Sequence, residues 1–220
     1  AKECFKKAIK INPNYADAHN NLGTIFQNLS ELQKAKECYE QAIKINPNQE
    51  KAYNNLAVIF TYLKDYQAAK ECYEKAIELN PNYTEALNNL GIIFQGLGEN
   101  QKAKSYYEKA IELNPSYADA HNNLGNIFKE LGEYTKAKDC FEQAIEINPN
   151  YVDAHNNLGN IFYELGEYTK AKECYEKAIE INPNYANAHS NLGVIYNKSS
   201  MLQKAKECYE KAITINPNHA

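Results

Sequence analysis

Leucine, alanine and aromatic residues recur along this chain at steps of three and four, and the whole set returns every 34 residues. Counting positions from Ala16, position 7 is always leucine, positions 11 and 24 are aromatic, and positions 20 and 27 are alanine. Such steps place apolar side chains on one face of a helix. Each 34-residue segment therefore predicts two amphipathic helices, with the small residues at positions 8, 20 and 27 marking their close approach.

Asn-Pro pairs recur with the same period, seven in all, and the chain has no other proline. Proline disfavours helix at the residue before it, so each pair is expected to end one helix and set the start of the next. Glycine suits the turn between paired helices in three repeats, where the others have serine or lysine. The residues directly after the prolines suit N-caps; they are Asn14, Asn48, Asn82, Ser116, Asn150 and Asn184.

A strict period of this length is typical of stacked repeat proteins, in which no single helix pair buries its apolar face alone. The sequence thus predicts one continuous solenoid domain. It would begin with the second helix of a truncated repeat at 1–15 and continue with full repeats at 16–49, 50–83, 84–117, 118–151, 152–185 and 186–219.

Composition argues against two classes of partner. The net charge is −4, and all 24 basic residues are lysine, so the arginine-rich basic stripe typical of nucleic-acid binders is missing. No apolar run approaches the roughly 18 residues that a membrane-spanning helix needs. We expect binding neither to nucleic acid nor to membrane.

Six cysteines share one repeat position, with Tyr106 filling the gap in their series. Equivalent positions in stacked helices lie roughly 10 Å apart, whereas a disulfide needs Cα atoms within about 7 Å. We therefore expect free, packing cysteines and a reducing compartment, the cytoplasm or nucleus. The six are Cys4, Cys38, Cys72, Cys140, Cys174 and Cys208.

Histidine recurs four times at position 4, which raises the question of a metal or acid–base site. These histidines belong to different repeats and cannot easily converge. The chain also lacks a Gly-rich phosphate loop, Gly-x-Ser-x-Gly, Cys-x-x-Cys and His-Glu-x-x-His. We expect no enzyme activity, no cofactor and no metal site.

The 34-residue pattern, with Leu-Gly at 7–8, aromatics at 11 and 24, alanine at 20 and 27 and proline at 32, closely resembles the tetratricopeptide repeat over the whole chain. The resemblance implies an all-α, right-handed superhelical solenoid of antiparallel helix pairs. It also implies a concave groove lined by positions 2, 5, 6, 9, 12 and 13 of each first helix. Position 4, often tryptophan in the family, is here histidine, tyrosine or leucine, a conservative change in bulk.

Positions 5 and 6 of the implied groove are asparagine almost without exception, although asparagine is a mediocre helix former. An asparagine amide has a donor and an acceptor, so a row of them can bind both groups of a peptide bond. A solvated face, or side-chain links between neighbouring repeats, would also explain the row. We call it the asparagine ladder: Asn20, Asn21, Asn54, Asn55, Asn88, Asn89, Asn122, Asn123, Asn156, Asn157 and Asn191.

Other positions change the polarity of this groove. At position 9, Asn126 and Asn160 extend the polar face. Val58 and Ile92 at position 9, with Tyr62 at position 13, predict an apolar side-chain pocket near the second and third repeats. Positions 5 and 6 carry no basic residue, which argues against the lysine clamp by which chaperone co-factors of the family hold a C-terminal carboxylate.

Three functions are compatible with these residues. The first is a protein-interaction scaffold that binds an extended segment of a partner along the asparagine ladder. The second is a substrate-recognition arm. The segment Ala-His-Asn-Asn-Leu-Gly at 120–125 and 154–159 is similar to the tetratricopeptide domain of O-linked N-acetylglucosamine transferases, and this resemblance implies such an arm, whose catalytic domain is absent here. The third is a spacer with an empty groove. Terminal helices without polar caps also predict end-to-end self-association.

Overall fold

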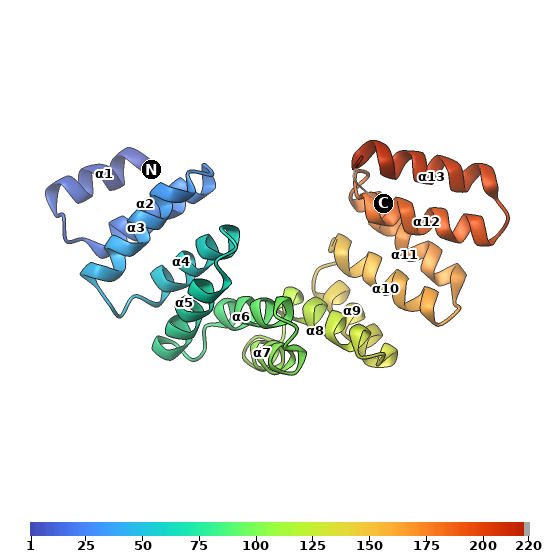
Figure 1. The fold of residues 1–220 in the computed structure, drawn as a ribbon, viewed down its shortest axis with the longest axis horizontal. Coiled ribbons are helices and arrows are strands. Elements are labelled where there is room, and N and C mark those ends of the chain that lie inside the picture. The colour runs from blue at the N-terminus through green and yellow to red at the C-terminus, as the bar shows by residue number, and fades with distance from the viewer. Residues whose placement is uncertain (218–220) are drawn as a thin grey trace. The chain divides into compact units, whose positions relative to one another are not determined.

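The computed structural model describes residues 1–217, and this part of the chain folds into 13 α-helices without a strand (Figure 1). The predicted all-α class is confirmed. None of these helices is long and apolar enough to cross a membrane. The helices are α1 (Lys2–Ile11), α2 (Ala16–Asn28), α3 (Leu32–Ile45), α4 (Glu50–Tyr62), α5 (Tyr66–Leu79), α6 (Thr84–Gly96), α7 (Asn100–Leu113), α8 (Ala118–Glu130), α9 (Tyr134–Ile147), α10 (Val152–Glu164), α11 (Tyr168–Ile181), α12 (Ala186–Lys198) and α13 (Leu202–Ile215).

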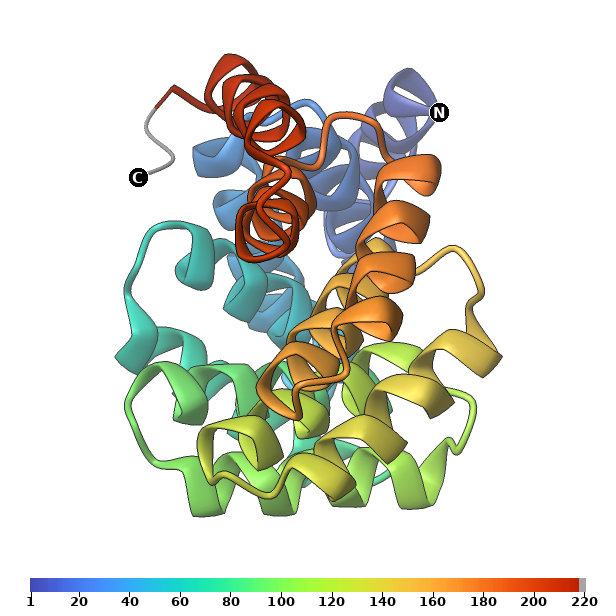
Figure 2. The ribbon, with the colours of Figure 1, turned by 90° about the vertical axis from the view of Figure 1, so that its right-hand side faces the viewer.

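The helices form two compact units, Ala1–Leu113 and Asn114–Ala220. In the first unit α2 pairs with α3, α4 with α5 and α6 with α7, and each pair packs on the next. In the second unit the pairs are α8 with α9, α10 with α11 and α12 with α13. The orange and red helices α11 to α13 show this stacking from two directions (Figures 1 and 2).

The core of each pair is an aromatic ring from the second helix set against a small residue of the first. A Cβ added at Gly159 would lie 2.5 Å from the Tyr175 ring, closer than real Cβ contacts allow. Gly23, Gly91 and Gly125 face rings in the same way. The second repeat has Ala57 at this position instead. The rings at position 24 are almost wholly buried in five repeats: Tyr39, Tyr73, Tyr107, Phe141 and Tyr175.

The predicted N-caps after the prolines are wrong by one residue. The first helices begin after the next residue along, such as Tyr15, and no side chain caps them. The asparagine before proline explains the difference, because the Asn12 side-chain oxygen accepts the N–H of Asn14 at 3.1 Å. This side-chain turn is one that asparagine favours. It recurs at Asn46, Asn80, Asn114, Asn148 and Asn182.

The histidines at position 4 hold the same loops. Nε2 of His121 lies 2.9 Å from the carbonyl oxygen of Pro115, so that nitrogen donates to the loop that precedes its own helix. His19, His155 and His189 make the equivalent contact at 3.0 Å. Each histidine thus has a local partner, and in residues 1–217 no three histidine, cysteine or acidic side chains gather as a metal site requires.

A left-handed residue closes the turn within each of the six pairs. Gly98, Gly132 and Gly166 have φ between 74° and 77°. Ser30, Lys64 and Ser200 adopt φ of 58° to 61° at the same position. Only glycine takes this conformation without a steric penalty, so three turns carry strain that the other three avoid.

Candidate functional site

The asparagine ladder has a buried row and an accessible row. The side chains at position 5 are buried, with exposed fractions of 3% to 7% from Asn20 to Asn156. Position 6 is partly exposed in the second to sixth repeats, and Asn21 is exposed. Only the row at position 6 therefore presents its amides to a ligand without a conformational change.

Hydrogen bonds join the two rows across neighbouring repeats. Nδ2 of Asn157 donates to Oδ1 of Asn122 at 3.1 Å. The same link joins Asn55 to Asn20 at 3.1 Å and Asn191 to Asn156 at 2.9 Å. We call this link the amide clasp. It is the inter-repeat role that the sequence left open for these asparagines, and it fixes the position-6 amide while leaving its Oδ1 to other partners.

A second link secures the acids at position 2. The hydroxyl of Tyr151 donates to Asp119 at 2.7 Å, and that of Tyr185 donates to Asp153 at 2.5 Å. Gln49 reaches Asp17 in the same way at 2.6 Å. Burial, and then the adjacent carboxylate, raise the pKa of Tyr185 to about 12, so the phenol stays a donor at neutral pH. Each of these acids therefore has one carboxylate oxygen engaged within the protein.

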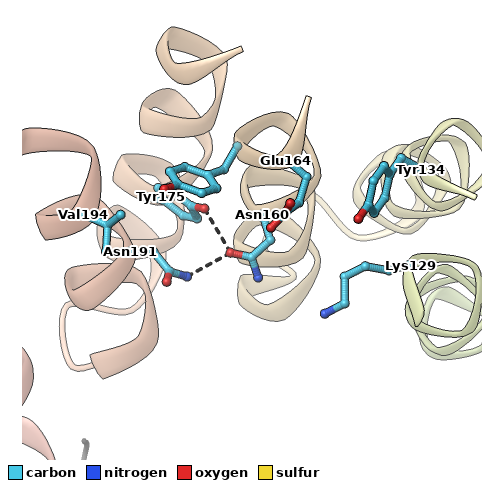
Figure 3. A pocket seen from close by; sticks show the side chains of 8 residues that line it. Lys129, Tyr134, Asn160, Glu164, Tyr175, Asn191 and Val194 are labelled. Carbon is cyan, nitrogen blue, oxygen red and sulfur yellow. Dashed lines mark hydrogen bonds between the residues drawn. The ribbon is translucent and has the colours of Figure 1, made fainter. Parts of the chain in front are cut away.

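The second unit has a hollow of about 400 Å³ centred on α10 (Figure 3). We call it the α10 hollow. Two predicted site residues, Asn160 and Asn191, line it. The sequence did not single out the other lining residues. Three of them, Lys129, Tyr163 and Glu164, are at positions 12 and 13, which were expected to face the groove. The additional lining residues are Lys129 from α8, Tyr134 from α9, Tyr163 and Glu164 from α10, Tyr175 from α11 and Val194 from α12.

Asn160 is held at the floor of the α10 hollow by two donors. The Tyr175 hydroxyl and Nδ2 of Asn191 both donate to its Oδ1, at 2.9 and 3.0 Å. Burial raises the pKa of the Tyr175 phenol, which therefore keeps its proton. With both acceptor positions filled, the amide cannot flip without losing two bonds, and its Nδ2 is turned away from these partners (Figure 3).

Opposite charges flank this amide. The ammonium of Lys129 and the hydroxyl of Tyr134 point toward α10 from the far side of the hollow, and Glu164 extends from α10 itself (Figure 3). Lys129 and Glu164 make no ion pair within residues 1–217, although the same hollow holds both. The site thus offers the donors of Lys129 and Tyr134 on one side, and on α10 the Nδ2 donor of Asn160 together with the carboxylate acceptor of Glu164.

The first unit has a smaller hollow of about 220 Å³ lined by Val58, Thr61, Tyr62, Tyr73 and Asn89. It brings together Val58 and Tyr62 of the predicted apolar pocket. Ile92, the third predicted residue, is 43% exposed but does not line the hollow.

The amide clasp is interrupted beside this smaller hollow. Oδ1 of Asn54 is buried and has no hydrogen-bond partner in the described chain. Burial raises the pKa of Tyr73 to about 12, and the amide of Asn89 and the hydroxyl of Thr61 oppose the shift. Asn89 is thus directed toward the tyrosine rather than toward Asn54.

Models of a repeat family match nearly the whole chain. A model described as TPR repeat and three described as tetratricopeptide repeat account for the matches. The first covers residues 1–30, 125–166 and 159–200, and the others cover 48–116, 16–49 with 186–219, and 106–139. A search of curated protein sequences gives no match.

Solved structures share the architecture. YrrB, described as a TPR protein with an unusual peptide-binding site, is 27% identical over 86% of this chain and 97% of its own, with a TM-score of 0.66. MamA is 28% identical over 74% of this chain and 95% of its own, with a TM-score of 0.63. PilF of Pseudomonas aeruginosa is 21% identical, covers 92% of both chains and has a TM-score of 0.82, a likeness of fold alone. Together with the paired helices and the 34-residue period, these matches show that the chain belongs to the tetratricopeptide-repeat family.

Proposed function

We propose that this chain is a non-catalytic scaffold that binds an extended segment of a partner protein along the first helices of its repeats. The observation that carries the proposal is the division of the asparagine ladder. The buried row anchors the clasp, and the accessible row presents amides whose orientation is already fixed. Such pre-organisation lowers the entropic cost of binding.

The amides at position 6 suit main-chain recognition. Each clasped amide of this row, such as Asn55 or Asn157, uses one N–H for the clasp and keeps a carbonyl oxygen that can accept a peptide N–H. Main-chain contacts give affinity with little dependence on sequence, so selectivity would come from side-chain pockets such as the α10 hollow. The description of the similar YrrB as a peptide-binding protein supports the same class of ligand.

Two further aspects stay proposals. The free state of all six cysteines supports a reducing compartment as the place of action. The alternative of a substrate-recognition arm for an O-linked N-acetylglucosamine transferase rests on the sequence phrase at 120–125 and 154–159 alone.

The test is binding of peptides selected on the wild-type protein from a random display library. The triple variant with Asn89, Asn123 and Asn157 changed to alanine should bind them at least about tenfold more weakly, since each lost hydrogen bond is worth a severalfold change in affinity. Helicity, measured by circular dichroism, should not change. Unchanged affinity would contradict the proposal, and failure to select any peptide would favour the empty spacer.

Two controls locate the effect. Alanine at Asn48, Asn150 and Asn184, which lie in the loops, matches the change in composition without touching the ladder. Asn122→Ala breaks a clasp from its buried side and leaves the accessible amide of Asn157 in place. Peptide affinity should fall in both variants, and further in Asn157→Ala, because Asn122→Ala removes the pre-organisation of the accessible amide but not the amide itself.

A further inference from the structure

We propose that the α10 hollow binds a primary carboxamide, the side chain of a glutamine or asparagine in the bound segment. This inference rests on the proposed function and specifies its selectivity. It starts from Asn160, whose two filled acceptor positions leave Nδ2 as the group that the amide offers to a ligand. Lys129 adds a charged donor on the facing side of the hollow. A ligand group must therefore present an acceptor here.

Glu164 requires a donor in the same ligand group. Its exposed carboxylate shares the hollow with Lys129, yet the two form no ion pair in the described chain. A ligand carboxylate would pair with Lys129 but be repelled by Glu164. A ligand lysine would pair with Glu164 but be repelled by Lys129. A primary carboxamide carries an acceptor oxygen and two N–H donors, so it matches both sides without net charge.

The rest of the lining suits the aliphatic part of such a side chain. Val194 and the ring of Tyr163 give the hollow apolar walls beside its polar ends. The volume of about 400 Å³ exceeds what one side chain fills, which leaves room for the adjoining main chain. The hydroxyl of Tyr134 can act as donor or acceptor and so fits either end of the amide.

In two other repeats a glutamine side chain of the protein itself occupies the place beside the position-24 tyrosine hydroxyl. In the first repeat the Tyr39 hydroxyl donates to Oε1 of Gln27 at 2.7 Å, and in the third the Tyr107 hydroxyl donates to Gln95 at 3.1 Å. Both glutamines occupy position 12, which is Tyr163 in the fifth repeat. In the fifth repeat the Tyr175 hydroxyl donates instead to the shorter Asn160, and the α10 hollow lies beside this asparagine.

The experiment is an NMR titration of the isotopically labelled full chain with acetyl-Gly-Gly-X-Gly-Gly peptides. Their C-termini carry an N-methylamide, so that X supplies the only primary carboxamide. We expect the X = Gln peptide to bind at least about fivefold more tightly than those with Gly, Glu, Lys or Leu, the gain of one or two hydrogen bonds. Its shifts should centre on α10 and on Lys129.

Asn160→Asp is the decisive variant, because it keeps an oxygen for Tyr175 and Asn191 and replaces the Nδ2 donor with a negatively charged acceptor oxygen. It should abolish the preference for glutamine. Asn126→Asp makes the same change at position 9 of the preceding repeat, outside the hollow, and should keep the preference. Glu164→Met, at an exposed position, tests the acceptor side independently if Asn160→Asp fails to fold, and it should also lose the preference.

The other outcomes separate this inference from the proposed function. Equal binding of the Gln and Gly peptides means that main-chain amides alone are recognised, which overturns the inference and leaves the scaffold proposal standing. Tightest binding of the Glu or Lys peptide overturns it in favour of a charged ligand. Absence of binding by every peptide up to about 50 mM, well above the millimolar range of weak ligands, contradicts both.

Discussion

At the scale of single residues, the close contact between position 8 and the ring at position 24 sets how near the paired helices come. A Cβ at Gly159 would overlap the buried Tyr175 ring, whereas one at Gly96 would meet nothing within 4 Å. The same substitution therefore has opposite expected effects at two helical glycines of one chain.

Gly159→Ala should lower the free energy of unfolding by about 1 kcal/mol, because overpacking costs about 1–3 kcal/mol and the gain in helix propensity offsets only part of it. Gly96→Ala should raise the same quantity by about 0.5–1 kcal/mol. Urea unfolding followed by circular dichroism measures both. The crowding argument fails if the two variants change stability by the same amount.

The strained turns give a second residue-level prediction. Lys64 holds φ of 61° where three repeats have glycine. Lys64→Gly should raise the free energy of unfolding by about 1 kcal/mol, the usual penalty for a side chain in the left-handed region. Thermal unfolding tests this, and Gly132→Ala should lower stability by a similar amount. A stability loss in Lys64→Gly would contradict the assignment of strain.

At the scale of helices and their neighbours, the amide clasp joins repeats through side chains that ordinary helix pairing does not require. A double-mutant cycle between Asn122 and Asn157 should give a coupling of about 1 kcal/mol, the net value of one hydrogen bond. The cycle between Asn54 and Asn89 should give a coupling near zero, because Asn54 Oδ1 has no partner in the described chain. Equal couplings would show that the interruption is not a property of the folded protein.

The helices themselves were predictable, because steps of three and four along 34 residues translate directly into apolar faces. The helix starts were missed by one residue, since Asn12 and its equivalents use their side chains to close the Asn-Pro turn, which competes with capping. Only part of the α10 hollow could be predicted from the sequence. Asn160 and Asn191 stand out in the repeat pattern, but Lys129 and Tyr134 arrive from other helices, and no spacing within one repeat reveals such convergence.

At the scale of the whole molecule, buried phenols and thiols make stability depend on alkaline pH. Burial raises the pKa of Cys72 to about 11 and those of Cys174 and Tyr73 to about 12, from ordinary values of 9.0 for cysteine and 10.0 for tyrosine. The unfolded chain thus loses these protons first. Their contribution is fully present below pH 9 and is lost as the pH rises from 9 through 12.

Tyr73→Phe should reduce this alkaline loss by about 1.4 kcal/mol at pH 11, because that pH lies midway between the unfolded and folded pKa values and one pKa unit corresponds to about 1.4 kcal/mol. At pH 7 its cost should be small, because Phe141 occupies the equivalent position in the fourth repeat. Urea unfolding of both proteins at pH 7 and pH 11 gives the comparison. If the free energy of unfolding depends on pH in the same way in both proteins, ionisation of Tyr73 does not contribute to the alkaline loss of stability.

The clasp also constrains how this protein can change in length. In the second unit, Asn157 bonds to Asn122 as Asn191 bonds to Asn156. Excision of residues 152–185 would bring Asn191 to Asn122, the same donor facing the same acceptor. An excision or insertion of any other size would set unlike side chains against each other at the link that spans the join. Insertions or deletions of one whole repeat therefore lengthen or shorten the binding surface and preserve the hydrogen bonds between the repeats that become neighbours.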